Sequence, residues 1–185
     1  MMLWVGLLWV QVASAGSLKD LDKRNGFRDV ALTQRCDQID GLKGNTGAVK
    51  AAVKDGLGQE LSKEQAPYLG MLHYTRPSDG LEVGRARLLD VTYTCYMDQL
   101  MAVDLVAWGE RNAEPLLGAL VEAFGPATKA DEETGVQRWV GKKVLLTYTF
   151  DKDTGFVRVA YASVPMIEAK RKNDEALEKA AVQDL

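Results

Sequence analysis

The sequence predicts an α+β domain in which an antiparallel sheet of about five strands packs on one main helix, with an N-terminal helix and a C-terminal helix or tail. Three observations support this class. Apolar residues recur at helical spacing between residues 112 and 124. They alternate with other side chains in three runs between residues 136 and 161, and again in two runs between residues 89 and 105. Consecutive strands without intervening long helices pair as antiparallel neighbours.

The main helix is predicted over residues 112–124. Asn112 is a good N-terminal cap, and Pro115 falls in the first turn, where its missing N–H is harmless. Gly125 and Pro126 end the helix, because glycine accepts a left-handed conformation and proline cannot continue the helical hydrogen bonds. The apolar side chains at helical spacing are Leu116, Leu117, Leu120 and Phe124. This stripe therefore has to be buried against the sheet.

The strands are predicted from alternation. After the helix, runs over residues 144–150 and 157–161 are joined by a turn at 151–155, and a shorter run covers 136–140, so the three form a meander. Before the helix, two more strands meet at a turn over residues 97–99. Their shared faces are formed by Leu89, Val91, Tyr93 and Cys95 on the first strand and by Met101, Val103 and Leu105 on the second.

The N-terminal third and the C-terminus are less regular. We expect a short strand at 27–32, a helical turn at 37–42, an alanine-rich helix at 46–54 and an edge strand at 72–75. Residues 16–165 are predicted to form a single domain without internal repeats. Residues 166–185 are rich in alanine, glutamate and lysine, which is typical of a solvated helix or a frayed tail.

Residues 1–15 are predicted to be a signal peptide. They carry no charged side chain, and their apolar run ends in Ala13-Ser14-Ala15, an A-x-A cleavage signal, so the mature chain should begin at about Gly16. The alternative is a buried N-terminal helix. Because the apolar run is too short to cross a bilayer, no permanent membrane anchor is expected after cleavage. The predicted location is therefore periplasmic or secreted.

Export changes the interpretation of Cys36 and Cys95, because thiols pair in oxidising compartments. We predict that they form a structural disulfide, and the alternative is two buried unpaired thiols. A different function would follow from free thiols. Cys36 or Cys95 with His73 and an acid such as Asp79 or Asp90 could in principle form a nucleophile, base and orienting group, although no local nucleophile motif surrounds either cysteine.

Composition excludes several classes of protein. A net charge of −3 and a calculated isoelectric point near 5.3 provide no basic field for nucleic acid, so no nucleic-acid partner is expected. One histidine and two cysteines leave little for a zinc site. The segment 151–155 resembles the opening of a calcium loop, but the glycine and glutamate required later are replaced by Phe156 and Ala162. We therefore predict no metal and no cofactor.

Arg76, Arg85 and Arg87 are the candidate binding residues. They lie close in sequence, and alternate strand positions place Arg85 and Arg87 on one sheet face, which could bind an anionic ligand or an acidic partner. The alternative is a solvated face balanced by nearby acids. Trp108 and Trp139 are expected to pack in the core rather than form a ligand platform.

The segments 25–30, 74–79, 91–93 and 123–128, followed by Trp139, resemble a group of uncharacterised exported bacterial proteins. The helix ending in Phe124-Gly125-Pro126, followed by an antiparallel sheet, is also similar to small outer-membrane assembly lipoproteins of the SmpA/BamE type, and more loosely to β-lactamase-inhibitor-like modules. The chain lacks the lipobox cysteine of those lipoproteins. The resemblance implies a non-catalytic binding or structural module, whose partner is an unknown protein or envelope component, with no catalytic residues.

Overall fold

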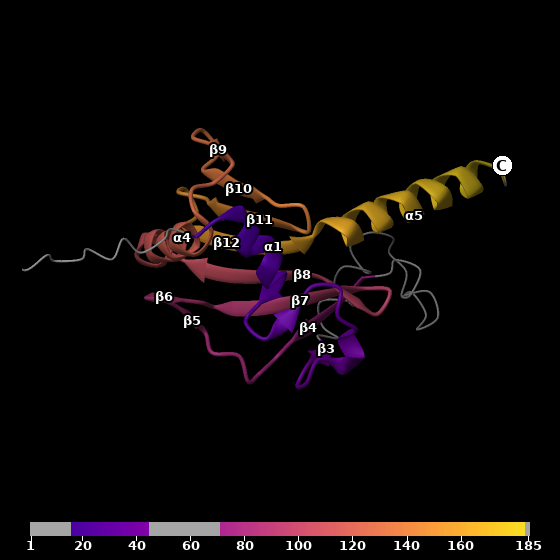
Figure 1. The fold of residues 1–185 in the computed structure, drawn as a ribbon, viewed down its shortest axis with the longest axis horizontal. Coiled ribbons are helices and arrows are strands. Elements are labelled where there is room, and N and C mark those ends of the chain that lie inside the picture. Colours follow the sequence, from indigo (N-terminus) through magenta and orange to yellow (C-terminus); the bar gives the residue numbers. More distant parts are fainter. Residues whose placement is uncertain (1–15, 45–70, 184–185) are drawn as a thin grey trace, which may run out of the picture.

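The computed structural model describes residues 16–44 and 71–183 (Figure 1). Within these ranges the chain forms three α-helices, a short 3-10 helix and an antiparallel sheet of eight strands, so the predicted α+β class is confirmed. The expected number of about five strands is too low. The prediction missed two edge strands of two and three residues, which are too short to show alternation.

The main sheet has the strand order β3-β4-β7-β8-β12-β11-β10-β9. Its strands in the first half of the chain are β3 (Lys43–Gly44), β4 (Met71–Thr75), β7 (Asp90–Tyr96) and β8 (Gln99–Trp108). Those in the second half are β9 (Lys129–Asp131), β10 (Val136–Val140), β11 (Val144–Phe150) and β12 (Phe156–Ser163). Two small hairpins lie outside this sheet, formed by β1 (Gly26–Phe27) with β2 (Val30–Ala31) and by β5 (Glu82–Val83) with β6 (Ala86–Arg87).

The topology repeats itself, although the sequence shows no repeat. Helix α1 (Leu18–Arg24) comes before β3, β4, β7 and β8, which add from one edge of the sheet to its centre. Helix α4 (Glu110–Phe124) comes before β9, β10, β11 and β12, which add in the same way from the other edge. The two halves meet where β8 pairs with β12 in antiparallel register, with Leu105 opposite Val159. The described sheet therefore has approximate two-fold symmetry.

Helix α4 covers one face of the sheet, as its apolar stripe predicted. Leu116, Leu120 and Phe124 are buried in the core, and Leu117 is partly buried against it. The predicted start is wrong, because the helix begins at Glu110 after Gly109, which has a positive φ of 82°. Asn112 therefore lies inside the helix, where its side-chain amide donates to the Trp108 carbonyl oxygen. Pro115 accordingly lies in the second turn.

The C-terminal meander confirms the three predicted strands and is fastened to the end of α4. Trp139 of β10 is fully buried, as expected, and its indole N–H donates to the carbonyl oxygen of Gly125 at 2.8 Å. The 151–155 segment forms the turn between β11 and β12, as predicted for a hairpin. Within the turn, the Asp151 carboxylate accepts the backbone N–H groups of Asp153 and Thr154.

The structure contains an N-terminal helix, α1, at a place where none was predicted. The predicted helix at 46–54 lies outside the described residues, whereas α1 packs against α4 and was missed because its seven residues contain only two apolar side chains, Leu18 and Leu21. Its Asp22 carboxylate accepts backbone N–H groups from Lys142, Lys143 and Val144 at 2.8–3.1 Å. This contact joins the first helix to the turn between β10 and β11, in the other half of the sheet.

Cys36 and Cys95 form the predicted disulfide. Their Cα atoms are 6.4 Å apart and their sequence separation is 59 residues. Cys36 opens the 3-10 helix η1 (Cys36–Gln38), which stands where a helical turn was expected at 37–42. Cys95 lies on β7 and faces the core. The bridge therefore ties the irregular segment after β2 to a regular strand of the sheet.

Three other expectations need correction or refinement. Leu89 is exposed and precedes β7 instead of sharing its buried face, because the chain is irregular over residues 88–89. Strand β4 covers the expected residues, but β3 pairs with it, so β4 is not the edge. The short strand predicted at 27–32 is the β1–β2 hairpin.

The C-terminal segment is a helix, α5 (Val164–Gln183), which continues from β12 and projects away from the sheet in Figure 1. Its exposed face carries ion pairs at i,i+4 spacing, from Lys170 to Asp174 and from Arg171 to Glu175. None of the helices in the described ranges is long and apolar enough to cross a membrane. The predicted signal peptide, residues 1–15, lies outside the described residues.

Candidate binding surface

Within residues 16–44 and 71–183, no helix covers the centre of the second face of the main sheet, which is called the open face below. Strand register assigns alternate residues to this face, opposite to the side that α4 covers. On β8, for example, Val103 and Leu105 are buried toward the helix, whereas Asp104 and Val106 are only half-buried. The half-buried residues of this face from β7 to β11 are Asp90, Thr92, Ala102, Asp104, Val106, Ala160, Ala162, Leu145, Thr147 and Thr149. Small and polar side chains therefore dominate the middle of this face.

Large exposed apolar side chains gather at the end of this face farthest from α5. Trp108 ends β8 and is 63% exposed, and it lies directly opposite Phe156, which begins β12 and is 43% exposed. Leu89, also exposed, bonds through its backbone N–H to the Val106 carbonyl oxygen and so lies beside the same end of β8. The exposed surface of Trp108 and Phe156 is called the aromatic end below.

Trp108 is held in this exposed position, which corrects the expectation that it packs in the core. Its indole N–H donates to the carbonyl oxygen of Thr154 at 2.9 Å. The ring lies over Gly155, where an added Cβ would come within 3.0 Å of the indole nitrogen, and Gly155 has a positive φ of 75°. A signal for this orientation was present in the sequence. Alternate residues of a strand point to opposite faces, so Trp108 lies on the same face as Val106 and on the opposite face from Leu105.

Charged groups flank the aromatic end. Arg158 follows Phe156 on the same face of β12 and forms an ion pair with Asp104 of β8, with a shortest nitrogen–oxygen distance of 2.6 Å. Arg138 of β10 is exposed on this face as well. Farther along, His73 of β4 makes a hydrogen bond of 3.1 Å with the Thr94 hydroxyl. The face thus combines aromatic, arginine and small side chains.

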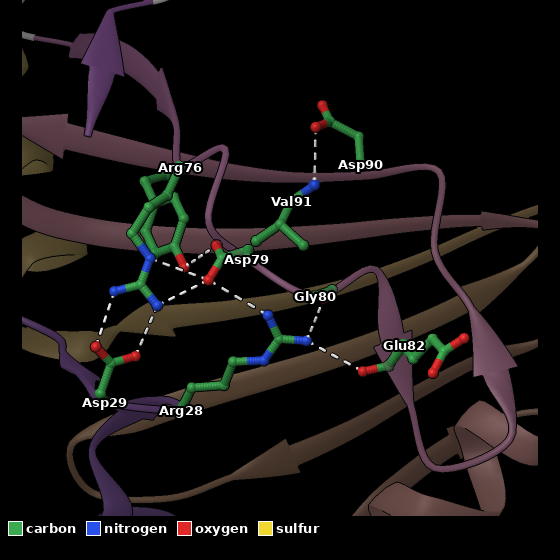
Figure 2. A network of polar contacts seen from close by, with 9 residues as sticks. Arg28, Asp29, Arg76, Asp79, Gly80, Glu82, Asp90 and Val91 are labelled. Carbon is green, nitrogen blue, oxygen red and sulfur yellow. Dashed lines mark hydrogen bonds and ion pairs between the residues drawn. The ribbon is translucent and has the colours of Figure 1, made fainter. Parts of the chain in front are cut away.

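The structure engages Arg76, one of the three candidate arginines, in a polar network on the other side of the sheet. Figure 2 shows its guanidinium between two carboxylates. It donates two hydrogen bonds to Asp29, at 2.8 and 2.7 Å, and two to one oxygen of Asp79, at 3.0 and 2.7 Å. Because the Asp79 side chain is only 2% exposed, its pairing with Arg76 is largely shielded from water.

Arg28 and Tyr93 complete this network. The Arg28 guanidinium lies 3.3 Å from Asp79 and donates to the carbonyl oxygens of Gly80 and Glu82 (Figure 2). The Tyr93 hydroxyl donates to the second Asp79 oxygen. Two arginines thus balance two aspartates, so the network joins the β1–β2 hairpin, the loop after β4 and strand β7 without excess charge.

Two pKa values reflect this arrangement. The hydrogen bonds from Arg76 lower the pKa of Asp29 to about 2, although the Asp29 side chain is mostly exposed. Burial, followed by the hydrogen bond to the Asp79 carboxylate, raises the pKa of Tyr93 well above its ordinary value. Both groups therefore keep their present charge states through the neutral range.

Arg85 and Arg87 remain on the surface. Arg85 lies in the β5–β6 turn and is exposed, and Arg87 of β6 is exposed with a long contact of 3.9 Å to Glu82. The structure therefore divides the predicted surface, because Arg76 is used by the network while Arg85 and Arg87 face solvent. The sequence could not show this division, since the partners of Arg76 include Asp29, 47 residues away.

The residues of the alternative catalytic site are separated. Cys95 faces the core and is bonded to Cys36, whereas His73 pairs with Thr94 on the opposite face of the sheet. The Asp90 carboxylate accepts the backbone N–H of Val91 and the hydroxyl of Thr92. A cysteine nucleophile would require reduction of the disulfide. In the ranges that the structure describes, no cluster of three or more histidine, cysteine, aspartate or glutamate residues is placed to hold a metal ion.

A further hollow of about 820 Å³ lies between α1 and α4, on the helix side of the molecule. Its lining carries both signs of charge and small side chains: Gly16, Asp20, Lys23, Arg24, Ala119, Glu122 and Ala123.

Comparison of the chain with family models, curated proteins and solved structures finds no match. The resemblance to SmpA/BamE-type and β-lactamase-inhibitor-like modules therefore stays a prediction.

Proposed function

We propose that this protein is an exported, non-catalytic binding module, periplasmic or secreted, that binds another protein through the open face of its sheet. The observation that carries the proposal is the aromatic end, where Trp108 and Phe156 are paired and exposed. Contiguous exposed apolar side chains with polar neighbours are typical of protein interaction sites. The disulfide is compatible with an oxidising compartment.

The chemistry of this face favours a protein partner. Tryptophan, tyrosine and arginine carry much of the binding energy in protein interfaces, and Arg158 lies two residues from Phe156 on the same face of β12, with Arg138 farther along this face on β10. Trp108 is already held by Thr154 and Gly155, so little side-chain freedom is lost when a partner covers it. The small residues in the middle of the face leave a shallow surface for a broad contact rather than an enclosed cavity.

The proposal is tested with a pair of variants on opposite sides of the molecule. The protein that begins at Gly16 is used to capture partners from envelope extract, and a captured protein is then purified and titrated against three forms. These are the wild type, the double variant Trp108→Ala with Phe156→Ala, and Val121→Ala. Val121 is an exposed apolar residue of α4, on the helix side, so it controls for a general loss of apolar surface.

The double variant should bind at least about tenfold more weakly than the wild type, because each aromatic anchor contributes more than about 1 kcal/mol at an interface centre. Val121→Ala should bind like the wild type. A partner that binds all three forms equally contradicts the proposal. So does an extract in which no protein binds saturably, or in which only lipid or cell-wall material is retained.

A further inference from the structure

At the C-terminal end of α4, the residues that follow the helix cannot supply one of the hydrogen-bond donors that its last carbonyl oxygens need. In a continuing helix the carbonyl oxygen of Glu122 would accept the N–H of the residue four positions later. That residue is Pro126, which has no N–H. The backbone nitrogen of Gly16 fills the position, at 3.1 Å from the Glu122 carbonyl oxygen. A residue more than 100 positions earlier in the chain therefore caps this helix.

The contact is possible only for glycine at position 16. A Cβ added there would lie 1.9 Å from the carbonyl oxygen of Ala123 and 2.7 Å from the nitrogen of Phe124. Both atoms belong to the backbone, so no side-chain movement can relieve the overlap. Gly125, which follows the last residue of the helix, also lies close to this segment, because a Cβ there would come 2.7 Å from the Gly16 carbonyl oxygen.

The last turn of α4 also lacks a basic residue of its own. Helix C-termini carry partial negative charge and are stabilised by nearby cations, but the last turn of α4 has no basic residue and contains Glu122. The groups that line the space around Gly16 are Asp20, Lys23 and Arg24 on α1 and Glu122 on α4. The acidic and basic side chains of this set balance in number, and the Arg24 guanidinium lies over the Phe124 ring, 5.5 Å from its centroid, rather than bonding to the carbonyl oxygens of the helix end.

We propose that Gly16 is the first residue of the mature protein, and that its α-ammonium group, created when the leader is removed, is the charged cap of α4. Gly16 directly follows the A-x-A signal, and its backbone nitrogen is the one that hydrogen-bonds to the Glu122 carbonyl oxygen. A charged amine strengthens this hydrogen bond and places a cation at the negative end of the helix. The inference rests on the export part of the proposed function.

Leader removal would then contribute to folding as well as to export. Cleavage of the peptide bond before Gly16 adds water across it and releases the leader as a carboxylate and the mature chain as an amine, which is protonated at neutral pH. The precursor has an uncharged amide at the same atom. The mature form should therefore be the more stable of the two, independently of what the open sheet face binds.

The test compares three forms of the chain that differ only at the amino terminus. One begins at Gly16, one retains Ala13-Ser14-Ala15, and one begins at Gly16 with an acetyl group, which keeps the N–H and removes the charge. At pH 6 the form with the free amine on Gly16 should melt about 3 °C above the other two, the size expected for one helix-end charge in a domain of this length. Equal melting temperatures for all three forms overturn the proposal.

The pH dependence supplies the second measurement. An amine stabilised as a cation in the folded state contributes fully below its unfolded pKa, about 7.7–8.0, and loses the contribution as pH rises through its folded-state pKa. The melting difference between the free and acetylated forms should therefore be constant near pH 6 and shrink above about pH 8. A difference that persists unchanged to pH 10 contradicts a role for the charge.

Two glycine variants on the same structural unit separate the close contact from general effects. Gly16→Ala should lower the melting temperature by about 5 °C or more, because overpacking against backbone is costly. Gly118→Ala, in the middle of α4 with nothing within 4 Å of the added Cβ, should leave it unchanged or raise it. Equal effects of the two variants overturn the assignment. Failure here leaves the Trp108 and Phe156 binding experiment unaffected, so the two proposals fail separately.

Discussion

The two halves of the sheet have the same topology but are stabilised by different means. In the C-terminal half, a helix of 15 residues buries an apolar stripe, and Trp139 is bonded to the end of that helix. In the N-terminal half, the corresponding helix has seven residues and buries only Leu21. There a disulfide and the Arg28–Asp29–Arg76–Asp79 network connect the irregular segments to strands β4 and β7.

The difference shows how both halves can keep a helix packed on the sheet although the two helices differ in length. The free energy gained by burying apolar side chains is roughly proportional to the area buried. A short helix covers less of the sheet and therefore stabilises it less. Cross-links and buried polar contacts act at single points instead, and they suit segments that follow no regular period. We therefore expect the N-terminal half to be sensitive to chemical conditions and the C-terminal half to be sensitive to changes in packing.

The largest effect is expected from removal of the disulfide. Cys36→Ala combined with Cys95→Ala should reduce the free energy of unfolding by about 4 kcal/mol, because the bridge restricts a long loop in the unfolded chain. Denaturant unfolding measures the loss, and hydrogen exchange locates it. Protection should fall more in β4 and β7 than in β10 to β12. An equal fall in both halves would break the distinction between them.

The matching change in the C-terminal half is Leu120→Ala. Leu120 is 2% exposed on the buried face of α4, and truncation should cost about 3 kcal/mol through lost burial and a residual cavity. Val121→Ala, the next residue and 38% exposed, should cost no more than about 0.5 kcal/mol. Urea midpoints of the two variants provide the measurement, and similar losses would place the stripe outside the core.

A smaller effect is expected from Asp79→Asn in the polar network. The change removes the buried negative charge that faces Arg76 and Arg28, while Arg76 keeps its contact with Asp29. We expect a loss of about 2 kcal/mol, below the cost of leaving a buried charge with no partner. Asp29→Asn is the control, because an exposed pair contributes about 0–1 kcal/mol. If the control costs as much, burial of Asp79 is not what stabilises the network.

The smallest effect concerns pH. Arg76 lowers the pKa of Asp29 to about 2, so the stabilisation from this carboxylate is complete above its unfolded pKa of about 3.9. It is lost as pH falls through about 2. Between pH 5 and pH 2 the wild type should therefore lose slightly more stability than Asp29→Asn, by less than about 1 kcal/mol because Asp29 is mostly exposed. If the free energy of unfolding of the two proteins falls in parallel as pH is lowered, Arg76 does not lower the pKa of Asp29.

Sequence reasoning succeeded where one period extends over several turns or residues. The stripe from Leu116 to Phe124 and the alternation in β10, β11 and β12 were sufficient, because burial on one face requires those periods. The start of α4 was misplaced because Asn112 resembles an N-terminal cap. The cap is instead Gly109, which has a positive φ, and the helix begins at Glu110. Strands of two or three residues have no period to detect.

The candidate surfaces were harder to predict. Arg76 was a candidate for a binding face, with balance by nearby acids as the alternative; its pairing with Asp79, three residues later, fits that alternative, whereas nothing local indicates Asp29. Trp108 was assigned to the core from its size alone, although its position in β8 gave the opposite parity. The cysteine pairing was predicted correctly because compartment and count supplied information that spacing could not.

The two edges of the sheet affect how the protein behaves at high concentration. Thr128 accepts the Val140 N–H and donates its own N–H and hydroxyl to the Arg138 carbonyl oxygen, so part of the outer rim of β10 is already bonded. Among the described residues, the strand beyond it is β9, three exposed residues with a charge at each end, and the opposite edge presents the exposed Lys43 of β3. A neighbouring chain finds little free backbone to extend the sheet, which resists fibril growth while the broad face stays accessible.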